Sequence, residues 1–343
     1  MREIQGSSAM NLLKHLFGKA LRANGAVYIC AVLIALLMTM VACGRSREPQ
    51  VLQIGVLPTR GALPLYVAQE KGYFADEGLD VKLIDFQSPA EKDAAFQAQE
   101  IDAMFSDLVA AALLRGRGEG IKVVALISGG EADEGRVAIV AAPQSGVQEL
   151  AQLSGKTVAL SPNTIMDFVT DELLARHGIA PEEIERVPVG KIHLRLAVLL
   201  EGKVAAATLP EPQITYAERA GGKVLVDDTD ESRTFLVLAA RQEICQANPE
   251  SVHKMVKAYN RAVEEINRDP TAFRETLIRV GKFPKEAEST AKVTRYAHRR
   301  VPDEKQVARV IAWLQKKGTL ADAFSYDALV EKSISQPRGE LNG

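Results

Sequence analysis

The sequence predicts a two-domain α/β protein with mostly parallel sheets. Short apolar segments alternate along the chain with helical patterns, which is typical of strand–helix–strand units. The apolar segments are near-continuous rather than strictly alternating, as expected for strands buried on both faces. A chain of 343 residues, 47% of them apolar, is long enough for two medium-sized cores.

The strand segments are spread evenly over the first two thirds of the chain. They are 51–57, 79–86, 102–106, 122–128, 135–142, 156–161, 185–189, 205–210, 223–227 and 234–240. The remainder reads as helical. Asn248-Pro249 supplies an N-cap with proline at the first helical position, and Asp269-Pro270 repeats this start. Asp303 with Gln306 matches a capping box, and Gly318 ends that helix.

Composition and charge exclude several classes of protein. A disordered chain would carry fewer apolar residues and more net charge than the −2 found here. Four basic residues and one acidic residue lie before residue 44, so the rest of the chain is mildly acidic. Such a body has no broad positive footprint, and we expect no nucleic-acid partner.

The N-terminus has the layout of a secretory signal, in which basic residues precede the uncharged apolar run 26–42. The sequence Met40-Val41-Ala42-Cys43 resembles a bacterial lipobox, although Met40 replaces the usual leucine. We therefore expect residues 1–43 to be a signal peptide with its lipobox, Cys43 to be diacylated, and 44–50 to be a polar tether. The alternatives are an uncleaved anchor helix, since the run approaches membrane-spanning length, and a start at Met10.

The stretch from Leu63 to Val81, LPLYVAQEKGYFADEGLDV, resembles a known family opening. It matches P-x-x-x-A-x-x-K-G-Y-F-x-x-E-G-L-D-V in the substrate-binding proteins of ABC importers, in the branch of nitrate, sulfonate, taurine and thiamine-pyrimidine-precursor binders. Stretches that fit the same pattern in order are 99–103, 122–125, 153–158 and 209–212. The family commonly has glycine at or just before Glu100, a departure that concerns a turn.

This resemblance implies a type II periplasmic-binding fold, with two α/β lobes and a ligand cleft between them. We place lobe one at 51–142 plus 238–330, lobe two at 143–237, and a C-terminal tail at 331–343. The crossings between lobes are then expected near 141–145 and 236–240. Ligand that touches both lobes stabilises the closed state, which a membrane permease would recognise.

Candidate ligand contacts follow from the rule that ligands sit beyond the carboxyl ends of strands, at helix N-termini. The candidates are Pro58, Thr59, Arg60, Gln87, Ser88, Ser106, Asp107, Ser161, Asn163, Thr164, Lys191 and Glu211. Each has a structural alternative. Ser88, Asp107 and Ser161 or Asn163 are also good N-caps, Arg60 and Lys191 suit solvated loops, and Glu211 suits a hinge. Asp107 with Glu211 would favour a cationic or hydrogen-bonding heterocycle over nitrate, but the ligand stays open.

The resemblance implies a monomeric binding protein, not an enzyme, with three partners: a small-molecule ligand, an ABC permease and the membrane through Cys43. It would be lipid-anchored, facing the periplasm or the cell exterior. No Cys/His spacing matches a metal site, and we expect no cofactor. The alternatives are a pyrimidine-synthase-like or menaquinone-pathway-like enzyme on the same fold, or a membrane-anchored sensory module. The synthase resemblance would require a cysteine cluster, which Cys30, Cys43 and Cys245 do not form.

Overall fold

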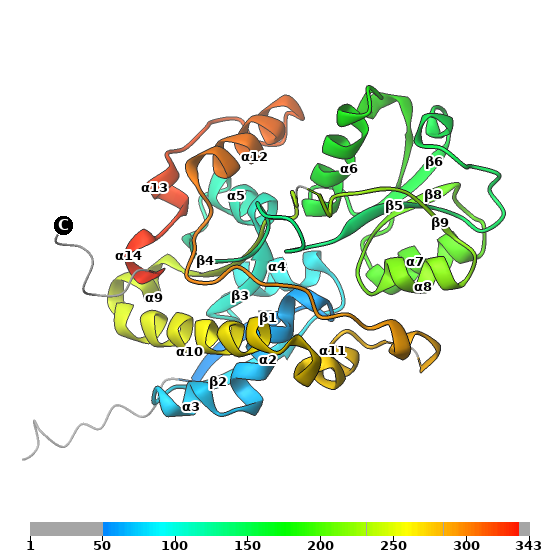
Figure 1. The fold of residues 1–343 in the computed structure, drawn as a ribbon. Helices are drawn as coiled ribbons and strands as arrows, with labels where there is room; N and C mark the ends of the chain where they lie inside the picture. Colours follow the sequence, from blue (N-terminus) through cyan, green and yellow to red (C-terminus); the bar gives the residue numbers. More distant parts are fainter. Residues whose placement is uncertain (1–50, 231, 284, 336–343) are drawn as a thin grey trace, which may run out of the picture. The chain divides into compact units, whose positions relative to one another are not determined.

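The computed structural model describes residues 51–230, 232–283 and 285–335, which form two five-stranded sheets (Figure 1). The predicted signal peptide, lipobox and tether lie outside the described residues. The first sheet has the order β2 (Asp80–Asp85), β1 (Val51–Val56), β3 (Ala103–Asp107), β10 (Leu236–Arg241) and β4 (Ile121–Ser128). Strands β1, β2 and β3 are parallel, whereas β10 is antiparallel to both β3 and β4.

The second sheet repeats this plan. Its order is β7 (Glu185–Pro188), β6 (Thr157–Leu160), β8 (Ala206–Pro210), β5 (Val137–Ala141) and β9 (Lys223–Asp227). Strand β5 is antiparallel to its neighbours β8 and β9, while β6 runs parallel to β7 and β8. In each sheet the antiparallel strand, β10 or β5, is the first strand after the chain crosses over from the other sheet. The predicted α/β class with mostly parallel sheets is confirmed.

The crossings lie elsewhere than the sequence predicted. Strand β5 bonds to β8 and β9, so residues 137–142 belong with lobe two rather than lobe one. Leu236 and Val237 pair with β3 and β4, which places them in lobe one. The crossings are therefore 129–136 and the segment between β9 and β10. An apolar run marks a buried strand, but its partner strands are remote in sequence and leave no local pattern.

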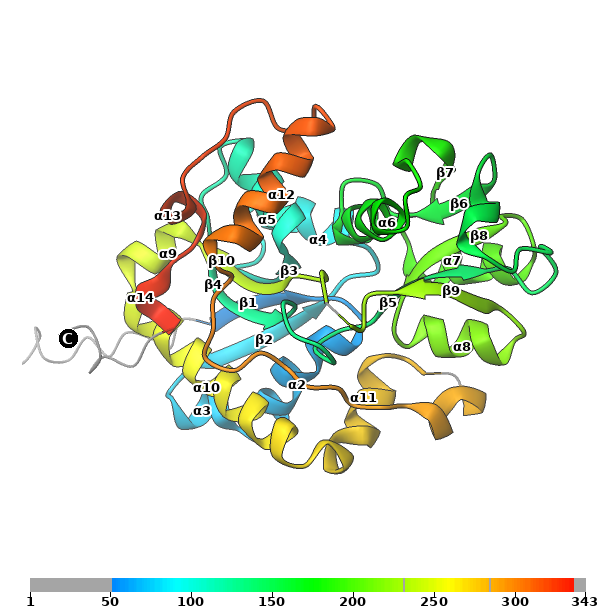
Figure 2. The ribbon, with the colours of Figure 1, turned by 45° about the horizontal axis from the view of Figure 1, so that its top comes forward.

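Helices cover both faces of the first sheet (Figure 2). One face carries α2 (Leu63–Glu70), α3 (Tyr73–Asp76), α10 (Pro249–Arg268) and α11 (Arg274–Val280), and the other carries α5 (Leu108–Gly116) and α12 (Glu304–Lys316). One apolar face of α10 is buried, including Val252, Val256 and Tyr259. In the family-like stretch, Gly72 and Gly78 take positive φ angles of 74° and 73°, which end α2 and turn the chain into β2.

In the second lobe, α6 (Ile165–Arg176) packs on β5 and β8, and α7 (Ile192–Leu200) and α8 (Gln213–Arg219) pack on the opposite face. The remaining elements of the described chain, from both lobes, have nine residues or fewer. They are η1 (Arg60–Ala62), α4 (Pro89–Gln97), η2 (Leu150–Leu153), η3 (Pro181–Glu183), α9 (Gln242–Ala247), η4 (Pro270–Phe273), η5 (Lys285–Thr290), α13 (Tyr326–Leu329) and α14 (Lys332–Ser335).

Two details of the C-terminal part differ from the prediction. Asp269-Pro270 begins the 3₁₀ helix η4 rather than an α-helix, and α11 follows it. The predicted tail at 331–343 begins too early, because Glu331 donates its amide to the Val123 carbonyl at 2.9 Å and Ile334 of α14 is buried. These contacts hold 331–335 against β4 and α10. Residues 336–343 lie outside the described part.

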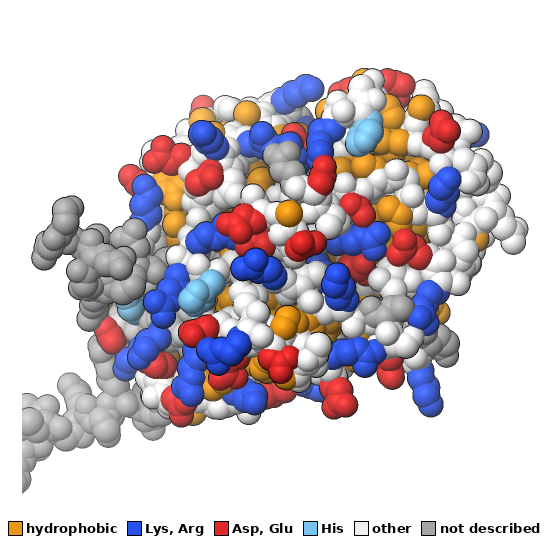
Figure 3. All heavy atoms as spheres, in the orientation of Figure 1, with side chains coloured by type: hydrophobic (Ala, Val, Ile, Leu, Met, Phe, Trp, Pro, Cys, Tyr) orange, Lys and Arg blue, Asp and Glu red, His pale blue; other side chains and the backbone are white. Residues whose placement is uncertain are grey.

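Acidic and basic side chains are interspersed over the face shown in Figure 3. The apolar surface visible there is broken into small areas between them. Across the described residues, no helix is both long enough and apolar enough to cross a bilayer.

Candidate functional site

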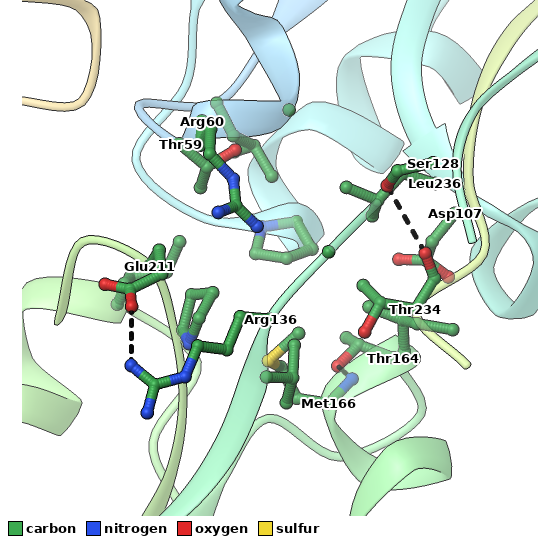
Figure 4. Close-up of a pocket in the computed structure, with 18 of the residues that line it drawn as sticks. Thr59, Arg60, Asp107, Ser128, Arg136, Thr164, Met166, Glu211, Thr234 and Leu236 are labelled. Atoms are coloured by element: carbon green, nitrogen blue, oxygen red, sulfur yellow. Dashed lines mark hydrogen bonds and ion pairs between the residues drawn. The ribbon is translucent and has the colours of Figure 1, made fainter. Parts of the chain in front are cut away.

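A chamber lies between the two sheets, at the carboxyl ends of several strands (Figure 4). The first lobe contributes Leu57, Thr59, Arg60, Gly61, Pro89, Phe105, Asp107, Ser128, Leu236 and Tyr296. The second lobe and the crossings contribute Glu134, Gly135, Arg136, Val137, Ser161, Thr164, Ile165, Met166, Gly190, Ile192, Arg195, Pro210, Glu211 and Thr234. We call this space the inner chamber. Its free volume is about 80 Å³, enough for roughly five to eight water-sized groups.

Thr59 and Arg60 form one wall because β1 ends at Val56 and the chain soon enters η1, in which Thr59 is the N-cap residue and Arg60 the first residue. The Thr59 side chain is buried, and its Oγ1 has no hydrogen-bond partner among the described residues. Tyr296 donates its hydroxyl to the Arg60 carbonyl at 2.7 Å, which holds this loop in place. The Arg60 side chain reaches from η1 into the chamber (Figure 4). This wall therefore presents a hydroxyl and a guanidinium.

Asp107 ends β3 and caps α5, where its Oδ1 accepts from the Ala110 amide at 2.9 Å. Burial raises the pKa of Asp107 to about 6, although the Ala110 bond, the charge of Lys92 and the backbone amide of Ile165 in the other lobe oppose that rise. A carboxyl group that already caps α5 has less capacity left for a ligand.

Thr164 and Arg195 form the opposite wall. Thr164 caps α6, with Oγ1 accepting from the Met166 amide at 3.2 Å and donating to the Ser161 carbonyl at 2.8 Å. Arg195 lies in the first turns of α7 and is only 1% exposed. One terminal nitrogen of Arg195 donates to the Val189 carbonyl at 2.7 Å, while its Nε has no partner among the described residues. Burial lowers the pKa of Arg195 to about 10.

Arg136, at the end of the first crossing, forms ion pairs with three acidic side chains at the mouth of the chamber. It donates to Glu211 at 3.0 Å, marked in Figure 4, to Asp227 at 2.9 Å and to Glu218 at 3.4 Å. Burial opposes the charge on Arg136, but these hydrogen bonds outweigh it and raise its pKa. Glu211 also accepts from the Thr215 hydroxyl at 2.9 Å. The Glu211 carboxylate is thus paired within the protein itself.

The other acid of the chamber, Glu134, is likewise engaged. It is 5% exposed, pairs with Arg300 and accepts from the Gly129 amide at 3.2 Å. Burial raises the pKa of Glu134, and the Arg300 charge opposes that rise. A wider, more polar space of about 450 Å³ adjoins the chamber through Arg60 and Arg136 and extends to Lys292.

The structure brings half of the predicted contacts together. Those at the inner chamber are Thr59, Arg60, Asp107, Ser161, Thr164 and Glu211. The others do not line it: Pro58, Gln87, Ser88, Ser106, Asn163 and Lys191. Their role in binding stays a prediction.

These other residues have structural partners or a different neighbourhood. Ser88 caps α4, and Ser106 accepts from the buried Lys92 at 3.5 Å. The Gln87 amide donates to Glu91 at 3.1 Å, and Lys191 pairs with the same carboxylate at 3.6 Å across the lobes. Ser88, Asn163 and Lys191 line a separate pocket between α4 and the start of α6.

Sequence reasoning missed the crossing residues Glu134 and Arg136 because it placed the crossing after β5. It also missed Arg195, which sits inside the apolar run of α7. A signal for Arg195 was available: IHLRLAVLL has one cation among aliphatic residues, one turn into a helix that follows a strand end.

Residues 61–273 match the model of the family described as NMT1/THI5 like. The chain belongs to this family. It is 26% identical over 247 residues to a Bacillus subtilis (strain 168) protein provisionally named an aliphatic sulfonates-binding protein, covering 68% of this chain and 72% of that one. It is 24% identical over 237 residues to the Saccharomyces cerevisiae 4-amino-5-hydroxymethyl-2-methylpyrimidine phosphate synthase THI5, covering 64% of this chain and 68% of that one.

Among solved structures, the fold is similar to the alkanesulfonate-binding protein SsuA from Xanthomonas axonopodis pv. citri bound to MOPS. The TM-score is 0.69 at 16% identity, and the match covers 83% of this chain and 99% of that chain. The type II periplasmic-binding fold that the sequence predicted is confirmed, as is the resemblance to that branch of binding proteins. Within the described residues, no three His, Cys, Asp or Glu side chains gather closely enough to hold a metal ion.

Proposed function

We propose that this protein is the solute-binding component of an ABC importer, and that it captures a small organic ligand by closure of its lobes. The observation that carries the proposal is the inner chamber. Its walls come from both lobes, and each wall presents a buried polar atom that has no hydrogen-bond partner among the described residues, Thr59 Oγ1 and Arg195 Nε. Buried polar atoms are nearly always satisfied, so these atoms indicate where a ligand belongs.

The connection between the lobes suits this role. The two crossings run side by side, with the Gly130 amide donating to the Ser232 carbonyl at 2.8 Å. A ligand held by Thr59 on one wall and Arg195 on the other contacts both lobes only when they are closed. It therefore shifts the population toward the closed state, which a permease can distinguish from the open one.

The proposal includes export and anchoring. The lipobox-like Met40–Cys43 sequence supports a diacylated Cys43 on a membrane-held, monomeric protein that faces the periplasm or cell exterior. Growth with an alkyne-labelled palmitate should label the wild type and not Cys43→Ser. Equal labelling of both proteins would remove the anchor from the proposal.

The second candidate is an enzyme, because the yeast relative is a named synthase. The synthase resemblance calls for clustered cysteines. Cys245 is buried, and burial raises the pKa of its thiol to about 12, so it is not a reactive thiolate. We favour binding without turnover. Mass spectrometry of a ligand recovered after incubation separates the two candidates, since a binding protein returns the ligand unchanged.

The direct test is a ligand screen on the full chain in detergent. The panel includes MOPS, short sulfonates and carboxylates, nitrate, taurine and aminopyrimidines. Ligand at 100 times its dissociation constant adds about 2.7 kcal/mol to the free energy of unfolding, a shift of several degrees. The single tryptophan, Trp313, lies at a contact between the lobes and reports closure through its fluorescence. A panel without any stabilising compound would contradict the proposal.

A further inference from the structure

Arg195 is a buried cation that the protein leaves without a counter-charge. It is 1% exposed, and among the described residues no carboxylate oxygen lies within 4.0 Å of its guanidinium. In the described part of the chain, the Val189 carbonyl accepts from one terminal nitrogen of Arg195, and Nε has no acceptor. Burying an unpaired charge is costly, so a folded protein keeps such a group where something else supplies the partner.

Another buried arginine shows how this protein normally satisfies the group. Arg241, at the end of β10, donates from Nε to the Ile101 carbonyl at 2.9 Å and from a terminal nitrogen to the Phe96 carbonyl. Its guanidinium also stacks 4.5 Å from the Phe96 ring centroid. Arg195 has no comparable set of contacts, and unlike Arg241 it lines the inner chamber.

The acids of the chamber are not available to Arg195. Asp107 caps α5 through the Ala110 amide, Glu134 pairs with Arg300, and Glu211 accepts from Arg136 and Thr215. The cation is therefore unneutralised within the chamber. Arg60 adds a second positive side chain from the other lobe.

The start of α7 reinforces this charge. Helix α7 has nine residues, and its N-cap residue Lys191 makes no side-chain capping bond. Gly190 and Ile192, on either side of that cap, line the chamber beside Arg195. The first amides of a helix and its dipole favour an anion at this end. A buried guanidinium without a carboxylate partner among the described residues and a helix start without a side-chain cap thus lie at one place.

Apolar side chains make up much of the remaining lining, between hydroxyl and charged groups. Leu57, Phe105, Ile165, Met166 and Leu236 surround the space, whose free volume is about 80 Å³. A ligand that fits is small, with a charged end toward Arg195 and a short hydrocarbon body against these side chains.

We propose that the ligand of this protein is a small organic monoanion, and that Arg195 holds its sulfonate or carboxylate group. This inference rests on the proposed solute-binding function and narrows it. Asp107 and Glu211, which as bare sequence positions favoured a cationic heterocycle, are engaged by the protein and do not select the ligand.

The test uses four probes of similar size with the full-length protein at pH 7.5: propane-1-sulfonate, butanoate, neutral propane-1-sulfonamide and cationic propylamine. Calorimetry should give at least one anion a dissociation constant 100-fold or more below those of the sulfonamide and the amine. The sulfonate and butanoate arms decide which oxyanion is preferred. Tighter binding of the amine or the sulfonamide would overturn the anion assignment and leave solute capture intact. If no probe or screened compound binds, the proposed function fails with it.

The variant Arg195→Met tests the residue itself, with Arg241→Met as the matched control. Arg195→Met should weaken anion binding at least 100-fold and raise the ligand-free melting temperature, because it removes an unpaired buried charge. Arg241→Met should lower the melting temperature and keep the affinity, since that guanidinium is satisfied and lies away from the chamber. A less stable Arg195→Met protein, or one with unchanged anion affinity, would show that Arg195 serves the fold alone and would overturn the assignment.

Discussion

Trp313 of the first lobe donates its indole N–H to Asp171 of the second lobe at 2.8 Å. Its ring meets Phe168 edge-on, with the centroids 5.4 Å apart. Lys317, one turn further along, reaches Asp167 at 2.8 Å. These contacts join α12 to α6 and continue the apolar core of the first lobe into the second. The lobes are therefore linked by packed side chains as well as by the two crossings.

Trp313→Phe should lower the free energy of unfolding by about 1–3 kcal/mol. Phenylalanine keeps the ring contact with Phe168 but leaves one oxygen of the buried Asp171 with fewer donors. Urea unfolding, followed by circular dichroism, measures the change. Gln315→Ala, on the exposed face of the same helix, is the control and should change stability little. Equal midpoints for wild type and Trp313→Phe would show that the hydrogen bond across the lobes contributes nothing.

Arg186→Met should lower the free energy of unfolding more than Trp313→Phe does, by about 2–4 kcal/mol. Arg186 donates to Asp167 at 2.6 Å and to Asp171, two carboxylates that are buried beneath α12. Without it, Lys317 is the cation that remains beside both carboxylates among the described residues, and an uncompensated buried charge is strongly destabilising. The comparison is Arg176→Met, whose partner Asp230 is 68% exposed, and which should lose less than about 1 kcal/mol. Similar losses for the two variants would contradict a special role for the buried cluster.

Asp107→Asn should remove part of the pH dependence of stability. Burial raises the pKa of Asp107 from 3.8 to about 6 in the folded protein. An acid with a raised folded pKa stabilises the fold while protonated, and that contribution is lost as pH rises from about 4 to 6. Asparagine caps helices as well as aspartate and carries no charge.

The free energy of unfolding of Asp107→Asn, relative to that of the wild type, should therefore increase as the pH rises. Between pH 4 and pH 7.5 this increase should be at most about 3 kcal/mol. Urea midpoints at the two pH values, measured without ligand, give the difference. If wild type and Asp107→Asn keep a constant gap between pH 4 and 7.5, the carboxyl group does not titrate in this range.

Gly129→Ala should destabilise the first crossing by about 2–4 kcal/mol. Gly129 has a φ angle of +113°, and a Cβ there would lie 2.8 Å from the Thr234 carbonyl oxygen of the second crossing. Gly146→Ala is the matched control, since Gly146 also has a positive φ, +71°, but open space around it. The control should cost about 1–2 kcal/mol for its backbone alone. Equal melting temperatures for the two variants would show that the close approach of the two crossings does not contribute to the destabilisation of Gly129→Ala.

Much of the fold could be predicted from the sequence because the patterns that specify it are local. Gly72 and Gly78 turn the backbone where the sequence motif predicted, and Asp303 with Gln306 forms the expected capping box. The strands β1, β2, β6 and β9 fall within their predicted segments. Each of these features depends on residues within one or two turns of one another.

The residues of the candidate site could be predicted from the sequence only in part. Thr59, Asp107 and Thr164 follow strand ends, and a rule about strand ends finds them. Arg136 was missed because the crossing was placed five or more residues too late, and Arg195 because an apolar helix pattern hides a single cation. The role of Glu211 could also not be predicted from the sequence, since its partner Arg136 comes from a distant segment.

The chain alone thus encodes its α/β class, the order of its strands and helices, and the family to which it is similar, because hydrophobic periodicity, caps and turns act over short distances. The sheet that β5 joins, the meeting of the two walls of the inner chamber, and the absence of a carboxylate beside Arg195 depend on contacts between residues far apart in sequence. Whether a buried charge finds a partner is settled only when those segments pack, since pairing and burial are properties of the folded surroundings rather than of the residue.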